Sequence, residues 1–268
     1  MTPRTRQPRV AVCLSSGFFG FFCHAGFLAG LEQDGGITPA ALGGSSAGAV
    51  AAALRATGMS HDEIRGRLRA IRTTDFLDLA GPRTWFTRGP GVVDGRRMLR
   101  LLQSLLPVDR FEDCAIPLVV STYDINDGEL RRFSEGPIAP AVVASSSVPY
   151  MFAPWRHSDG HLLWDGGIVD KTPVDAVAGL VSPVERALVH FLPSKRPRRS
   201  PWGAAGVHDA LRIDVDGLRR ERTEAAGVPV EWHVTRAVPL APFRLERGFE
   251  AYEQGRATGR TAAEQILS

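Results

Sequence analysis

One serine of this 268-residue chain lies in a setting suited to covalent chemistry on acyl groups. Ser46 is the centre of Gly44-Ser45-Ser46-Ala47-Gly48, which fits the pattern G-x-S-x-G. A serine on a sharp strand-to-helix turn of this kind exposes its Oγ, as acyl transfer requires. Gly44 and Gly48 would let backbone from both sides pass close to the turn. Because short Gly/Ser/Ala strings also form ordinary turns and phosphate-binding loops, the rest of the sequence must decide between these interpretations.

A serine hydroxyl also needs a base that removes its proton, and the sequence offers two kinds. One is an aspartate acting directly. Asp165 follows the apolar run 162–164 and precedes Gly166 and Gly167, which allow a tight turn. Active residues of open α/β sheets gather at such strand ends, although Asp-Gly-Gly is also a common surface turn. The other kind is a histidine, as in the α/β-hydrolases, and the downstream candidates are His190, His208 and His233.

Acyl transfer further requires hydrogen-bond donors for the oxyanion of the tetrahedral intermediate. Residues 15–20 read Ser-Ser-Gly-Phe-Phe-Gly and lie between an expected strand and an expected helix. Consecutive backbone N–H groups can point into one site at such a position. Gly17 and Gly20 permit the backbone conformations that the turn needs. The same glycines would also serve simple chain reversal.

Strands alternate with helices in the elements that must position these residues. The apolar patterns predict strands over 9–14, 117–122, 129–133, 160–164, 186–192 and 229–235. They predict helices over 21–33, 47–56, 62–72, 96–106 and 138–146, the third opened by a capping box at Ser60 and Glu63. This alternation predicts a mostly parallel central sheet in a three-layer α/β/α sandwich, with residues 1–268 forming a single domain.

Residues 75–95 show no clear helical or strand period. They contain Gly81-Pro82, Trp85-Phe86 and Gly89-Pro90-Gly91. Such a stretch is interpreted either as a mobile, apolar-rimmed lid or as a packed surface loop, and the sequence leaves both open.

The bulk composition narrows the class of protein. The chain is 44% hydrophobic and 23% charged, which is typical of a globular protein, and its net charge of +3 argues against dedicated nucleic-acid binding. The spacing of Cys13, Cys23 and Cys114 suggests neither a disulfide framework nor a metal site, which favours a cytoplasmic, reducing compartment. The basic run 195–199 is interpreted as a solvated loop, with contact to anionic lipid headgroups as the alternative.

Residues 10–31 contain no Asp, Glu, Lys or Arg and follow the basic stretch 4–9. By length they fit a membrane span or a signal peptide. Polar and small residues interrupt the run, so a strand, a glycine turn and a buried helix explain it equally well. We therefore expect neither a signal peptide nor a transmembrane helix, and only transient contact with a membrane surface.

Four blocks occur in order along residues 9 to about 180. They are Leu14–Gly20 with His24–Leu28, Gly44–Gly48, Ala144–Pro149 with Phe152–Pro154, and Asp165–Val174. In this order, and with 119 positions from Ser46 to Asp165, they resemble the patatin-like phospholipase family of serine acyl hydrolases.

The resemblance implies a Ser-Asp dyad that works without histidine. Ser46 would carry the acyl group, Asp165 would accept its proton, and the backbone at Gly17, Phe18 and Phe19 would hold the oxyanion. Water would then release the fatty acid from a phospholipid or neutral-lipid ester. The implied fold is an α/β/α sandwich related to the α/β-hydrolases but distinct from them, and neither a metal nor another cofactor is implied.

The glycine-rich loop departs from the pattern that the resemblance suggests. The family commonly has Arg or Lys before its last glycine, whereas residues 15–20 contain no basic side chain. Two alternatives therefore stay open: a lipid-binding or scaffold protein with degenerate activity, and a histidine-assisted α/β-hydrolase esterase. Transacylation also remains, because it uses the same acyl-enzyme. Lipid class, acyl-chain preference and oligomeric state are not indicated.

The aromatic residues around this loop allow two interpretations. Phe18, Phe19, Phe21 and Phe22 would line an acyl pocket or belong to the core, and for Phe21 and Phe22 we expect the core. His24 is expected to be a packed helix residue and not a catalyst.

Overall fold

A central sheet organises the computed structural model, which describes residues 8–193, 224–238, 240 and 245–268. Its strands follow the order β10-β11-β9-β1-β2-β4-β8-β7, and β5 pairs with β4 in addition. The strands are β1 (Val10–Leu14), β2 (Ala41–Ser45), β4 (Leu118–Asp124), β5 (Glu129–Phe133), β7 (Trp155–Arg156), β8 (Leu162–Asp165), β9 (Arg186–Phe191), β10 (Glu224–Ala225) and β11 (Val228–Val234). A separate pair joins β3 (Gly91–Val93) to β6 (Tyr150–Phe152).

Parallel pairing runs through β11, β9, β1, β2 and β4, while β5, β7, β8 and β10 pair antiparallel. The mostly parallel sheet expected from the sequence is confirmed. All five residues of β1 are buried, because β1 is central and helices cover both faces of the sheet. This double burial explains why the strand reads as a continuous apolar run.

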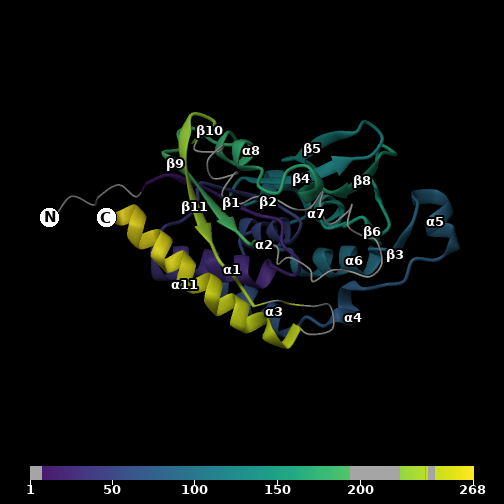
Figure 1. Cartoon of the computed structure of the whole chain (residues 1–268), viewed down its shortest axis with the longest axis horizontal. Helices are drawn as coiled ribbons and strands as arrows, with labels where there is room; N and C mark the ends of the chain where they lie inside the picture. Colours follow the sequence, from purple (N-terminus) through teal and green to yellow (C-terminus); the bar gives the residue numbers. More distant parts are fainter. Residues whose placement is uncertain (1–7, 194–223, 239, 241–244) are drawn as a thin grey trace.

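Helices on both faces make the three layers (Figure 1). On one face α1 (Phe21–Ala29), α2 (Ala47–Ala56), α7 (Ile138–Ser145) and α11 (Gly248–Leu267) share a core with Val10, Val12 and Leu14. On the other face α8 (Val174–Ala178) packs on the alternate residues Ala11 and Cys13. Successive side chains of β1 point to opposite faces of the sheet and thus belong to two separate apolar cores.

The apolar segment 10–31 is accounted for by this packing. It forms β1, the loop after it, and α1, whose last turn continues as the π-helix η1 (Gly30–Asp34). Glycines allow α1 and α11 to approach closely, since a Cβ at Gly26 would collide with the carbonyl of Tyr252 and one at Gly255 with that of Cys23. No helix in the described ranges is both long and apolar enough to cross a membrane.

The capping box predicted at Ser60 is present. Ser60 Oγ accepts from the Glu63 N–H at 3.2 Å, and the Glu63 carboxylate accepts from the Ser60 N–H at 2.8 Å. The helix that follows, α3, spans His61–Ala70, so it begins one residue earlier and ends two residues earlier than expected. The helix α6 (Arg96–Leu105) agrees with its prediction to within one residue.

Residues 75–95 contain more regular secondary structure than the sequence predicts. They take part in α4 (Thr73–Phe76), α5 (Pro82–Arg88) and β3, whereas the sequence shows no helical or strand period there. The helical pattern of α5 was hidden because its buried residues are polar, namely Thr84 and Arg88. The strand β3 was hidden because its partner β6 lies almost 60 positions further along the chain.

Candidate active site

Ser46 occupies the turn between β2 and α2 with φ of 56° and ψ of −123°. A positive φ is uncommon for a residue with a side chain and marks a sharp, constrained turn. The two flanking glycines are required sterically: a Cβ at Gly44 or at Gly48 would press on the Leu14 carbonyl. Serine at this turn is half-buried and lines a pocket. The local geometry is therefore the one that the pentapeptide predicted.

A second serine, which the sequence argument did not single out, braces this turn. The N–H of Ser46 donates to Ser145 Oγ at 2.9 Å, and the Ser145 hydroxyl donates to the carbonyl of Ser121 at 2.7 Å. Ser145 is fully buried, so the bridge ties the end of α7 to β4 and to the Ser46 turn. In the sequence, Ser145 lies in the block Ala144–Pro149, for which the sequence alone gives no role.

Asp165 ends β8 close to the Ser46 side chain, which lowers the pKa of its carboxyl. The Asp165 Oδ1 accepts from the Gly167 N–H at 2.7 Å. The tight turn behind it needs glycine, because a Cβ at Gly166 would meet the Ser121 carbonyl and one at Gly167 would meet the Ser16 side chain. The structure thus brings together two residues that lie 119 positions apart.

Burial sets the acidity of Asp165. Asp165 is 5% exposed, and this burial raises the pKa of its carboxyl to about 6. The Ser46 side chain, the bond from the Gly167 N–H and the Lys171 charge act in the opposite direction. A carboxylate with a pKa near 6 is a better proton acceptor at neutral pH than an ordinary one. The arrangement can therefore draw the proton from Ser46.

Lys171 is a further buried charge that sequence reasoning missed. It is 6% exposed, and burial lowers the pKa of its ammonium while the Asp165 carboxylate raises it. Its carbonyl accepts from the Ser16 N–H at 2.9 Å, which fixes the glycine-rich loop to the Asp165 turn. Lys171 lies within the Asp165–Val174 block, but the sequence alone gives no role for its side chain.

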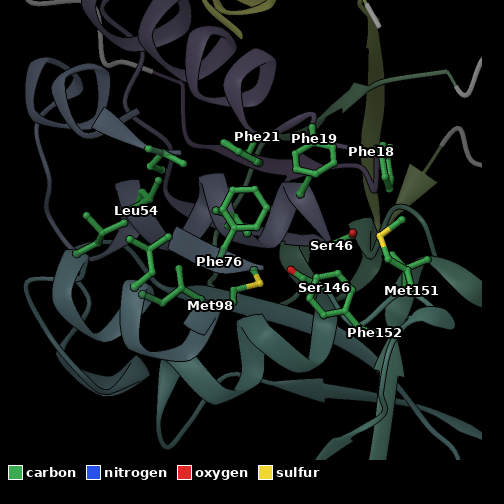
Figure 2. A pocket seen from close by; sticks show the side chains of 18 residues that line it. Phe18, Phe19, Phe21, Ser46, Leu54, Phe76, Met98, Ser146, Met151 and Phe152 are labelled. Atoms are coloured by element: carbon green, nitrogen blue, oxygen red, sulfur yellow. The ribbon is translucent and has the colours of Figure 1, made fainter. Parts of the chain in front are cut away.

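The glycine-rich loop leaves donors free next to Ser46. Its turn is closed by a bond from the Gly20 N–H to the Gly17 carbonyl at 2.9 Å, and Phe19 has a φ of 54°. Within the described ranges, the N–H groups of Gly17, Phe18 and Phe19 donate to no other group. These three residues line the same pocket as Ser46, and Figure 2 shows Phe18 and Phe19 there. Unpaired backbone donors in this position suit a developing oxyanion.

The pocket itself is almost wholly apolar. It has a volume of about 100 Å³, and Ser46 and Ser146 supply its only polar side chains among the residues that line it. Figure 2 shows Ser46 on its wall, facing Met151 and Phe152, with Phe76 and Met98 along its length. Such a lining fits a hydrocarbon chain better than a polar group.

The phenylalanines divide between pocket and core. Phe22 is 1% exposed and belongs to the core, as expected. Phe21 packs against the same core, as expected, but it is partly exposed and also lines the pocket with Phe18 and Phe19. One residue of shift along α1 rotates a side chain by about 100°, which is why two adjacent phenylalanines face different surroundings.

The histidines form a buried network behind the loop. His24 Nε2 donates to the Ser15 carbonyl at 2.8 Å, its Nδ1 contacts His190 Nδ1 at 2.8 Å, and His190 Nε2 contacts Thr235 Oγ1 at 2.9 Å. Burial lowers the pKa of His24 to about 3 and lowers that of His190 as well, so both are neutral. The bonds of His190 are to these partners and not to Ser46, and His24 is packed as predicted.

The other two histidines considered as bases are His208 and His233. His233 is 8% exposed and lies 4.0 Å from the Glu231 carboxylate. His208 and the basic run 195–199 fall outside the described residues. In the part of the chain that is described, one group of side chains could ligate a metal ion, formed by Asp124, Asp127 and His161.

Comparison with known proteins identifies the family of this chain. A family model described as patatin-like phospholipase matches residues 12–178. An uncharacterized NTE family protein of Mycobacterium tuberculosis is 30% identical over 174 residues, covering 65% of this chain and 47% of that protein. Patatin-like phospholipase domain-containing protein 7 of Rattus norvegicus is 28% identical over 186 residues, which cover 67% of this chain and 13% of that protein. The chain thus spans about half the length of its mycobacterial relative.

The solved structures extend the likeness to the fold. The crystal structure of VipD from Legionella pneumophila superimposes with a TM-score of 0.56 at 16% identity, covering 97% of this chain and 67% of VipD. The likeness shows a shared architecture that includes the later part of the chain, beyond the matched residues 12–178.

Proposed function

This chain belongs to the patatin-like phospholipase family, and we propose that it is a serine acyl hydrolase that cleaves carboxylic esters of lipids. The observation that carries the proposal is the position of Ser46, on a sharp strand-to-helix turn that the strand register places close to the buried Asp165 carboxylate. It pairs a nucleophile with a base at the wall of an apolar pocket.

In the proposed first half-reaction, Ser46 Oγ attacks the carbonyl carbon of the ester and its proton passes to Asp165. The carbonyl oxygen becomes an oxyanion, which accepts hydrogen bonds from the free N–H groups of Gly17, Phe18 and Phe19. The tetrahedral intermediate then collapses as the C–O bond to the alcohol breaks. Asp165 returns the proton to the departing alcohol, and an acyl-enzyme on Ser46 remains.

In the second half-reaction, water replaces the alcohol. Asp165 accepts a proton from the water as its oxygen attacks the acyl carbon, and the same N–H groups hold the new oxyanion. Collapse breaks the bond to Ser46 Oγ, which regains its proton from Asp165, and the carboxylic acid leaves. An alcohol in place of water would give transacylation from the same intermediate.

The apolar lining of the pocket supports a lipid as the substrate class. Its wall offers hydrocarbon contacts along most of its length, so burial of an acyl chain contributes about 0.8 kcal/mol for each methylene removed from water. We infer that the acyl part of a phospholipid or neutral lipid occupies it, while the alcohol part lies toward solvent.

Turnover of 4-nitrophenyl acyl esters tests the proposal. We expect Ser46→Ala and Asp165→Asn each to lower kcat/KM by at least about a thousandfold. The matched control is Ser104→Ala on the exposed side of α6, for which we expect a change within about twofold. Undiminished turnover by folded Ser46→Ala protein would exclude this function.

A further inference from the structure

Exposed apolar side chains gather at one end of the molecule. Eight large hydrophobic residues of the described ranges are strongly exposed, and five of them belong to α5, β3, β6 and the segment before α5. We call them the α5–β6 patch: Leu79 (84% exposed), Trp85 (53%), Phe86 (94%), Val92 (59%) and Tyr150 (59%). Figure 1 shows α5 and β3 at the end farthest from both chain termini.

Backbone and side-chain bonds hold the patch together as one surface. The Ala80 N–H donates to the Val92 carbonyl at 2.9 Å, and the Trp85 indole N–H donates to the Gly91 carbonyl at 2.8 Å. Gly91 in turn is paired with Tyr150 across the two strands. The exposed side chains therefore stand on a fixed framework and not on a loose loop.

The helix α5 is amphipathic in the inverse sense. Its inward side chains are polar: Thr84 donates to the Asp94 carboxylate at 2.5 Å, and Arg88 pairs with the same carboxylate at 2.7 Å. Its outward side chains include Trp85 and Phe86. Surface helices of soluble proteins show the opposite arrangement. A cluster of this kind marks an interaction surface, whereas single exposed hydrophobic residues do not.

Positive charge borders the patch. Arg83 is exposed on α5, one turn before Phe86, and makes no ion pair with any described residue. Arg156 is exposed, and it donates to the carbonyls of Thr87 in α5 and of Gly160. Among the residues that the structure describes, no carboxylate forms an ion pair with Arg156. Aromatic residues next to unneutralised arginines are the combination that suits the interface of a bilayer containing anionic lipid.

The strand β6 connects the patch to the pocket. Tyr150 belongs to the patch, and the next two residues, Met151 and Phe152, line the pocket with Ser46 (Figure 2). Phe18, which lines the same pocket, is 50% exposed. A lipid surface bound to the patch would therefore lie next to the cavity that we assign to the acyl chain.

We propose that the α5–β6 patch docks this protein on the surface of an anionic lipid bilayer, from which the pocket at Ser46 draws its substrate. This inference rests on the proposed function, because that function makes a lipid the molecule to be delivered. Phe86 and Leu79 enter the acyl boundary, and Arg83 and Arg156 contact lipid phosphates.

Vesicle sedimentation tests the docking surface. Wild-type protein and the Leu79→Ser/Phe86→Ser double variant are mixed with vesicles of phosphatidylcholine alone and with 30% phosphatidylglycerol. We expect the double variant to bind anionic vesicles about tenfold more weakly or worse. The matched control is Leu267→Ser, which removes a hydrophobic residue that is 60% exposed on α11, and we expect it to bind as wild type. We expect Arg83→Gln to weaken binding to anionic but not to neutral vesicles.

Two activity assays separate this inference from the proposed function. The double variant should hydrolyse a soluble 4-nitrophenyl ester as fast as wild type and vesicle lipid about tenfold more slowly. Ser46→Ala should bind vesicles normally while hydrolysing neither substrate. If Ser46→Ala retains activity but binding follows the patch, the proposed function fails and the docking surface stands. Equal vesicle binding by wild type and the folded double variant, or dimers of wild type that the variant loses without any vesicle binding, would overturn the docking surface.

Discussion

The acidity of the Asp165 carboxyl is changed because the fold buries it. Burial raises its pKa from 3.8 to about 6, so it is ionised at neutral pH but protonated in mild acid. Only the ionised form can accept a proton from Ser46. We therefore expect kcat/KM to fall as pH drops below about 6, and a pH–rate profile with a neutral ester substrate measures this directly.

Lys171 offers a test of how that acidity is set. Its positive charge lowers the pKa of Asp165, in opposition to burial. Removing the charge with Lys171→Met should raise the Asp165 pKa further and move the acidic limb of the profile to higher pH. Lys171→Arg keeps the charge and should leave the limb nearer to that of wild type. An unmoved limb in folded Lys171→Met protein would contradict the electrostatic role.

Ser145 can be tested against its neighbour Ser147. Ser145→Ala leaves the Ser46 N–H and the Ser121 carbonyl without their partner, which should cost about 1–3 kcal/mol in the free energy of unfolding and lower kcat. Ser147 Oγ donates to the Val143 carbonyl four residues earlier and has no bond to the Ser46 turn. Chemical denaturation and kcat should therefore both respond to Ser145→Ala, whereas Ser147→Ala should leave kcat nearly unchanged.

At the scale of elements, the close crossing of α1 and α11 depends on glycine. A Cβ at Gly255 would collide with the Cys23 carbonyl, whereas one at Gly66, in the exposed part of α3, would meet nothing within 4 Å. We expect Gly255→Ala to destabilise the protein by about 1–3 kcal/mol through overpacking. Gly66→Ala should instead stabilise it by about 0.5–1 kcal/mol, because alanine is the better helix former. Thermal unfolding of both variants checks the contrast.

The sequence predicted these elements unevenly, for physical reasons. The buried strand at residues 10–14 and the helix at 47–56 have strong local patterns, and both were placed correctly. The region 75–95 was not, because α5 buries polar residues against Asp94 and β3 depends on a distant partner strand. The turn at Ser46 and the glycines around it could be predicted from the local sequence pattern. Ser145 and Lys171 were not, since their importance comes from contacts across the fold.

At the scale of the whole molecule, strand register brings the site together. Ser45 pairs with Ser121 in β4, and the adjacent Thr122 pairs with Asp165 in β8. The sheet order β1-β2-β4-β8 thus places the glycine-rich loop, the Ser46 turn and Asp165 side by side at one edge. The spacing of the motifs along the chain could suggest this meeting only through resemblance, because nothing local specifies the register.

Intact-mass labelling with a fluorophosphonate probe tests the central claim most directly, because the probe reacts only with an activated serine. Wild type, Ser46→Ala and Asp165→Asn are compared as folded proteins. We expect one adduct on wild type that maps to Ser46, none on Ser46→Ala, and much slower labelling of Asp165→Asn. An unlabelled wild-type protein, or an adduct that persists at equal rate in Ser46→Ala, would contradict this expectation and favour lipid binding without this catalysis.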